Sequence, residues 1–120
     1  LDTYRRALLV HMRDEEDVVL PAYRDLGGDQ TDAPVRLFLG EHSKMRDFVD
    51  DFGRRTASLV ARADDCALLE LFDREATYKN LVIHHDLRER NCLYPFLAER
   101  LDAVAAARIA AAITWTGSAM

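Results

Sequence analysis

The residues best suited to chemistry are two histidine–glutamate pairs, each with the glutamate four positions after the histidine. The first pair is His11 with Glu15, and the second is His85 with Glu89. On a helix, residues four apart are neighbours, with roughly 5–6 Å between their Cβ atoms. Each pair therefore directs one imidazole and one carboxylate to the same point in space. Two such pairs facing each other predict a metal site.

A third histidine, His42, interrupts an apolar stripe with Phe38 and Met45 on the helix predicted between the two pairs. A lone histidine on an apolar face is usually a hydrogen-bonded core residue. Here three predicted helices each place a histidine on the buried stripe, and isolated charges in a dry core are costly unless they are paired or coordinate a metal. The predicted metal ligands are His11, Glu15, His42, His85 and Glu89.

The ligand types narrow the choice of metal. Imidazole plus carboxylate, with no thiolate in register, argues against a structural zinc site. Carboxylates that can bridge two ions favour iron or manganese. The pattern also differs from the His-Glu-x-x-His zinc protease motif, because the second histidine of that motif is missing. Iron is the predicted metal.

Composition limits the fold and the partners. In 120 residues, 49% are hydrophobic and 31% are charged, while Gly and Pro are scarce, which predicts a soluble all-α protein with residues 1–120 as a single domain. A net charge of -5 without a basic run gives no reason to bind nucleic acid or an anionic membrane. The most apolar stretch, residues 103–115, is too short to span a membrane. Two distant cysteines suggest no disulfide framework, so a reducing cytoplasm is expected.

Hydrophobic periodicity predicts the helices that position the ligands. The first is expected to end near Pro21, with Val18 continuing the stripe of His11 and Glu15. Residues 27–30 read as a loop, and Asp32 is expected to cap a second helix over about residues 33–60.

The third predicted helix starts after a cap at Asp64 or Asp65 and ends near Pro95, with Cys92 on the stripe of the second pair. A last helix, rich in alanine, is expected to begin at Asp102 and to serve packing alone. The chain beyond residue 115 is expected to be a frayed end.

These motifs in this order resemble the hemerythrin family, specifically the bacterial hemerythrin-like (HHE cation-binding) domains. The resemblance covers essentially the whole chain. It is carried by three segments: His11-x-x-x-Glu15-Glu16 closing at Leu20-Pro21, then Glu41-His42, then His84-His85-x-x-x-Glu89 closing at Leu93-Tyr94-Pro95.

The resemblance implies an up-and-down four-helix bundle around a non-haem di-iron centre with an oxo or hydroxo bridge. Glu15 and Glu89 would be the bridging carboxylates, and His11, His42 and His85 the terminal ligands. It also implies that the iron pair binds O₂, nitric oxide or peroxide.

One departure from the family pattern concerns its leading helix, whose histidine is an additional ligand; this chain opens directly on the helix of His11. One iron would then have an extra open position, for water, Glu41, an external ligand or a residue of a second chain, and a single-iron site stays an alternative. The apolar seam left by such a helix favours a homodimer.

Further residues near the ligands have two readings each. His84 is rotated about a quarter turn from His85, so a surface or supporting role is favoured over ligation. Glu16 is expected to pair with an arginine rather than to ligate. Tyr4 and Tyr78 read most simply as core aromatics, with walls of the ligand pocket as the sharper alternative.

Three functions follow from these features. The first is a binding protein for O₂, nitric oxide or peroxide that serves sensing, storage or detoxification. The second is an enzyme that turns over peroxide or oxidises Fe(II), and the third is a metal-poor structural or regulatory bundle. The first is favoured, and the sequence assigns no catalytic residue.

Overall fold

The computed structural model describes residues 2–62 and 64–113, and the predicted frayed end from residue 115 lies outside them. All regular structure in this part of the chain is helical, which confirms the predicted all-α class. In chain order the elements are α1 (Asp2–Asp14), the π-helix η1 (Glu15–Val19), α2 (Leu20–Asp25), the 3₁₀-helix η2 (Gly28–Gln30), α3 (Val35–Ala61), α4 (Asp65–Arg88), the π-helix η3 (Glu89–Leu93), α5 (Tyr94–Arg100) and α6 (Ala103–Ala112).

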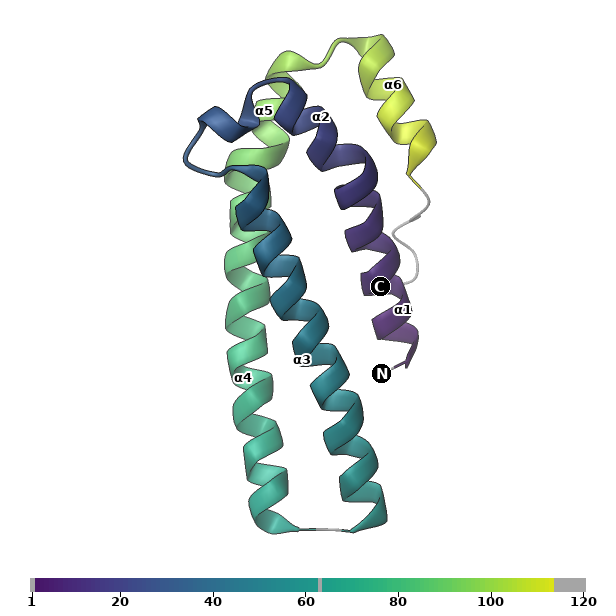
Figure 1. The fold of residues 1–120 in the computed structure, drawn as a ribbon, viewed down its shortest axis with the longest axis vertical. Coiled ribbons are helices and arrows are strands. Elements are labelled where there is room, and N and C mark those ends of the chain that lie inside the picture. Colours follow the sequence, from purple (N-terminus) through teal and green to yellow (C-terminus); the bar gives the residue numbers. More distant parts are fainter. Residues whose placement is uncertain (1, 63, 114–120) are drawn as a thin grey trace.

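The described elements group into four helical bodies, as predicted. We call α1–η1–α2 the first limb and α4–η3–α5 the second limb, because each continues without a break. Figure 1 shows α3 and α4 side by side and antiparallel along the long axis, with the first limb beside α3. The short α6 folds back next to the first limb and touches η1.

Two apolar clusters form the core, one on each side of the predicted ligands. The first core cluster contains Leu8, Met12, Met45, Val49, Phe52, Leu71 and Tyr78. The second core cluster contains Val19, Leu20, Tyr23, Ala33, Phe38, Leu93 and Leu97. Along each of the three long helical bodies, Glu15, His42, His85 and Glu89 fall between residues of one cluster and residues of the other, while His11 lies beside the first core cluster. The ligands therefore form a polar layer between two apolar ones.

The prediction that Pro21 and Pro95 end their helices was wrong. Each proline lies in the first turn of an α-helix, α2 or α5, that continues its limb. A proline inside a helix lacks an N–H and its ring presses on the carbonyl four residues earlier. A five-residue π-helix lies before each proline. This wider turn makes room for the ring, so the limb continues instead of breaking.

The π-helical turns also shift which residues are buried. Val18 and Cys92 were predicted to continue the ligand stripes, but both are only half-buried. The following residues, Val19 and Leu93, are 4% and 0% exposed. The extra residue in each π-helical turn rotates the chain by one position, which the regular α-helical period does not anticipate.

The helix caps agree with the prediction at two of three places. Asp64 accepts a hydrogen bond from the backbone N–H of Cys66 at 2.9 Å, and Asp102 accepts one from Ala105 at 2.7 Å. Asp32 does not cap α3. The Oδ1 atom of Asp29 accepts from the backbone N–H of Val35 at 2.8 Å instead, because the loop bends back through the preceding 3₁₀ turn.

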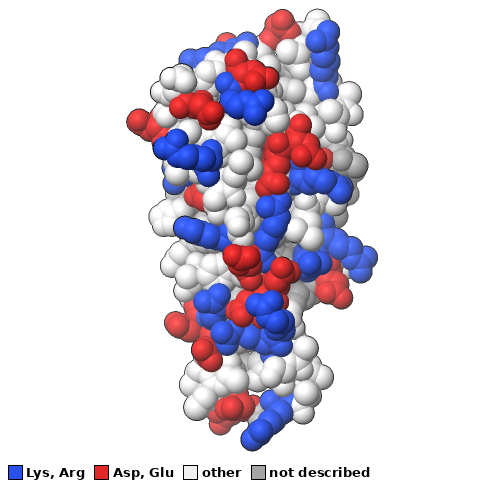
Figure 2. Space-filling view, in the orientation of Figure 1, with Lys and Arg blue, Asp and Glu red and all other residues white. Residues whose placement is uncertain are grey.

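Ion pairs tie the helices together on the outside. Asp51 of α3 accepts hydrogen bonds from Arg55 at 2.8 Å and from Arg74 of α4 at 2.9 Å. Arg5 of α1 reaches Asp50 of α3 at 3.1 Å. Figure 2 shows acidic and basic side chains interspersed over the face it draws. None of the described helices combines the length and the apolar character that a membrane crossing requires.

We predict that Gly28→Ala destabilises the protein by about 1–3 kcal/mol, because a Cβ at this position would overlap the ring of Tyr23. That ring cannot easily move, since it is fully buried and its hydroxyl donates to the carbonyl of Ala33 at 2.8 Å. Urea unfolding measures the effect. Gly40→Ala is the matched control, because it meets no atom within 4 Å and should stabilise α3 by up to about 1 kcal/mol. Equal effects of the two substitutions would contradict the prediction.

Candidate metal centre

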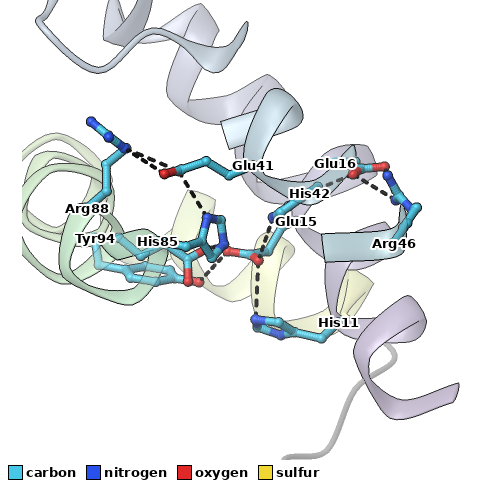
Figure 3. A network of polar contacts seen from close by, with 10 residues as sticks. His11, Glu15, Glu16, Glu41, His42, Arg46, His85, Arg88 and Tyr94 are labelled. Carbon is cyan, nitrogen blue, oxygen red and sulfur yellow. Dashed lines mark hydrogen bonds and ion pairs between the residues drawn. The ribbon is translucent and has the colours of Figure 1, made fainter. Parts of the chain in front are cut away.

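Four of the five predicted ligands converge in one buried cluster. Glu15, His42, His85 and Glu89, which we call the ligand cluster, each offer a ligand atom within 4.8 Å of the others. The Nε2 atom of His42 lies 3.4 Å from Oε1 of Glu15, and Nε2 of His85 lies 3.3 Å from Oε2 of Glu89. Figure 3 shows Glu15 of the first limb, His42 of α3 and His85 of the second limb pointing toward one another.

Three atoms of the ligand cluster are buried without a hydrogen-bond partner among the described residues. They are Oε1 of Glu15, Nε2 of His42 and Oε2 of Glu89. Leaving a buried polar atom unsatisfied costs about 1–3 kcal/mol, so three such atoms on one cluster call for a ligand. Imidazole nitrogens and carboxylate oxygens suit a divalent metal ion such as iron, manganese or zinc. The donor set therefore fits a metal ion.

His11, the fifth predicted ligand, lies at the edge of the ligand cluster. Its Nε2 atom is 3.2 Å from Oε1 of Glu15, and its side chain is 25% exposed. The i,i+4 spacing thus brings His11 to Glu15 as predicted, but on the solvent side of it. Among the three predicted histidine ligands, His11 is therefore the one that is partly exposed to solvent.

Glu16 orients His42. Its Oε2 atom accepts from Nδ1 of His42 at 2.7 Å, and Nη2 of Arg46 donates to both of its carboxylate oxygens at 2.7 and 2.8 Å. Glu16 therefore has the arginine partner that was expected of it. With Nδ1 occupied, the Nε2 atom of His42 faces Glu15.

Glu41 holds His85 in the same way. Its Oε1 atom accepts from Nδ1 of His85 at 3.1 Å, and Nε of Arg88 donates to Oε1 at 3.2 Å and to Oε2 at 3.3 Å. The structure thus places Glu41 behind His85 rather than in the ligand cluster. A carboxylate on the far nitrogen is the usual companion of a metal-binding histidine, since it fixes the tautomer and the ring orientation.

Tyr94 is a site residue that the sequence analysis missed. Its hydroxyl donates to Oε2 of Glu15 at 3.0 Å and so joins the second limb to the first. In a straight α-helix, Tyr94 would be rotated by about 140° from Glu89. The π-helix η3 brings it back toward the ligand face, and no helical period in the sequence signals that turn.

The remaining candidates lie away from the ligand cluster. His84 is exposed, as favoured from its position beside His85. The hydroxyls of Tyr4 and Tyr78 are 2.6 Å apart, and Tyr78 belongs to the first core cluster. The two tyrosines line a groove of about 440 Å³ whose lining contains none of the predicted ligands. Within the described structure, the two hydroxyls therefore form a hydrogen bond with each other.

The two carboxylates of the ligand cluster have opposite pKa shifts. Burial raises the pKa of Glu89 to about 7, together with the hydrogen bond to Glu15 and the charge of that neighbour. Burial also acts to raise the pKa of Glu15, but the nearby imidazoles of His11 and His42 outweigh it and hold this pKa below its ordinary range. Burial acts to lower the pKa of His85, but the bond to Glu89 and that carboxylate's charge raise it to about 9. Without metal, the cluster retains protons near neutral pH.

We predict that the metal-free protein loses stability as the pH rises from about 5 to about 9.5. Glu89 binds its proton more tightly when folded, so its contribution is full below pH 4.5 and is lost as the pH passes about 7. The contribution of His85 is full below pH 6.5 and is lost as the pH passes about 9. Metal ions must displace these protons, so metal binding should strengthen with rising pH.

Urea unfolding of the metal-free protein at several pH values tests this prediction. Glu89→Gln should flatten the lower half of the decline, because the amide does not titrate, and should also weaken the upper half, because the carboxylate that raises the pKa of His85 is gone. A metal-free protein that gains stability between pH 6 and 9 would contradict the assignment of the protons to the cluster.

Comparison with protein families agrees with these observations. The model of the hemerythrin HHE cation-binding domain matches residues 1–97, a range that contains all five predicted ligands but not α6. No curated protein and no solved structure gives a significant match. The match covers most of the chain, and its cation-binding description agrees with the buried cluster of histidines and glutamates. The chain belongs to the hemerythrin HHE cation-binding domain family.

Proposed function

We propose that the protein holds a non-haem di-iron centre that binds O₂, nitric oxide or peroxide for sensing, storage or detoxification. One observation carries the proposal: three unsatisfied ligand atoms, on Glu15, His42 and Glu89, face one another in a dry layer. Carboxylates from two separate limbs are suited to bridge two ions. Iron bound at this site would coordinate small molecules that contain oxygen or nitrogen.

Each side chain would have a defined role as a metal ligand or as a support for one. Glu15 and Glu89 would bridge the irons, while His42 and His85 would ligate through Nε2, the atom that each turns away from its supporting glutamate. His11 would complete the site from its edge. Arg46 behind Glu16 and Arg88 behind Glu41 balance the negative charge that these two glutamates bring close to the site. Burial acts to raise the pKa of Glu16, but the hydrogen bonds with Arg46 and His42 outweigh it and hold this pKa below its ordinary value.

Reversible binding is favoured over acid–base chemistry on an organic substrate. The carboxylates of the ligand cluster are needed to hold the metal, and the two apolar core clusters enclose them. Tyr94 supplies a hydroxyl beside the centre, but that hydroxyl is engaged with Glu15. Burial and the charges of Glu15 and Glu89 raise the pKa of Tyr94, so this phenol stays protonated and a hydrogen-bond donor.

Iron loading tests the proposal. Anaerobic addition of Fe(II), followed by metal analysis, should give between about one and two irons per chain. Absorption spectra before and after O₂, nitric oxide and peroxide should show bands that disappear when the ligand is removed. Rapid, repeated loss of peroxide would instead identify an enzyme. A protein that retains zinc and takes up no iron would overturn the di-iron proposal.

A further inference from the structure

An apolar groove of about 460 Å³ leads to the edge of the ligand cluster. His11, Glu15 and Tyr94 lie along one part of its lining, and Ala106, Ile109 and Ala110 of α6 lie along another. The other groove near the core, between Tyr4 and Tyr78, reaches none of these ligands. The groove beneath α6 therefore leads from the surface to the His11 and Glu15 side of the ligand cluster.

The wall formed by α6 is held loosely. No residue of this helix is buried, and its packing rests on half-buried Ile109 and on Ile113 just beyond it, both against the second core cluster. Asp102 caps the helix at Ala105. The family match ends at residue 97, so α6 lies outside the matched range.

The chemistry of the groove discriminates by charge. Its lining is mostly aliphatic, while the two acidic side chains in it, Asp14 and Glu15, lie at the end near the first limb and are almost fully buried. An anion that enters must leave water for a mostly aliphatic lining, which costs free energy. A small uncharged molecule loses little hydration on the same path.

We propose that α6 is the outer wall of an access groove that admits small uncharged molecules to the His11 side of the metal centre and delays anions. This inference rests on the proposed function, because it assigns the route by which the ligand of that centre arrives. The expected occupant of the groove is a neutral molecule about the size of a dissolved gas. The alternative occupant is a second protein chain.

The first test uses xenon, an uncharged probe, on the full-length metal-free chain. Xenon should shift the NMR methyl signals of Ile109 and Ile113, which line the groove. Ala110→Phe should abolish the shifts, because the ring fills the groove. Ala111→Phe is the matched control and should keep them, since Ala111 is exposed and turned about 100° from Ala110.

The second test uses the iron-loaded protein and compares the binding rates of nitric oxide and azide. Ala110→Phe should slow nitric oxide binding by roughly tenfold at unchanged iron content, while Ala111→Phe should match the parent. In the parent, nitric oxide should bind faster than azide. If Ala110→Phe displaces α6 instead, Ala106→Leu replaces it, with Ala107→Leu as its control.

The outcomes separate this inference from the proposed function. Normal iron content with unchanged nitric oxide rates and unchanged xenon shifts in Ala110→Phe would overturn the access groove alone. If the parent protein does not load iron, the proposed function is overturned. The xenon shifts, which are measured without metal, would still test whether the groove admits a small neutral molecule. A groove variant that dissociates an oligomer of the parent would show that a second chain occupies the groove, which also overturns the inference.

Discussion

Glu15→Ala is expected to remove most of the iron that the protein binds. Glu15 is 2% exposed, contacts His11 and His42 through one oxygen and accepts from Tyr94 through the other. Its loss takes away a carboxylate of the ligand cluster, the one proposed to bridge the irons, and opens the layer between the two core clusters to water. Metal analysis after anaerobic Fe(II) loading measures the loss. Glu89→Ala should have a similar effect.

Glu16→Ala is the neighbouring control for that experiment. Glu16 contacts His42 and Arg46 but offers no atom to the ligand cluster. Its loss should leave iron bound but weaken the affinity by roughly 10–100-fold, which a chelator titration measures. Equal iron loss in Glu15→Ala and Glu16→Ala would show that the assignment of the bridging residue is wrong.

The second large effect is expected for His42→Ala. The side chain of His42 is fully buried, and its ring centroid lies 4.8 Å from that of His85. The substitution removes the imidazole that α3 contributes to the ligand cluster, yet leaves Glu16 paired with Arg46, so no new unpaired charge is created. Iron content should fall to about half or less, and the remaining iron should dissociate faster in a chelator titration.

His84→Ala is the control for a histidine close in sequence to the ligands but exposed to solvent. It should keep the iron content and the chelator resistance of the parent. A His42→Ala protein that binds iron as fully and as tightly as the parent would mean that α3 contributes no ligand.

The sequence predicts which side chains converge where the α-helical period holds. His11 and Glu15, and likewise His85 and Glu89, lie one turn apart, and local helix geometry alone brings each pair together. His42 is recognisable because it replaces an apolar residue on a buried stripe. These inferences need no knowledge of how the helices pack.

The supporting contacts depend on packing and could not be predicted in the same way. Glu41 is the sequence neighbour of His42, yet it holds His85 across the helix interface. Glu16 is the neighbour of Glu15, yet it holds His42. Adjacent residues on a helix point about 100° apart, so a neighbour in sequence serves a different helix in space. The access groove likewise depends on how α6 folds back, which no local pattern specifies.

The π-helices η1 and η3 each absorb one extra residue without changing which faces of their limb are buried. A π-helical turn contains one residue more than the α-helical turn it replaces. Removing a residue such as Asp17, whose side chain is exposed, would restore a regular turn and leave Leu20 and Tyr23 facing the second core cluster. The cost would instead fall on Pro21, because its ring would again press on the carbonyl four residues earlier. We therefore expect a single deletion in a π-helical turn to keep the fold at reduced stability, whereas a deletion in the middle of α3 would rotate the residues after it by about 100° and disrupt the core.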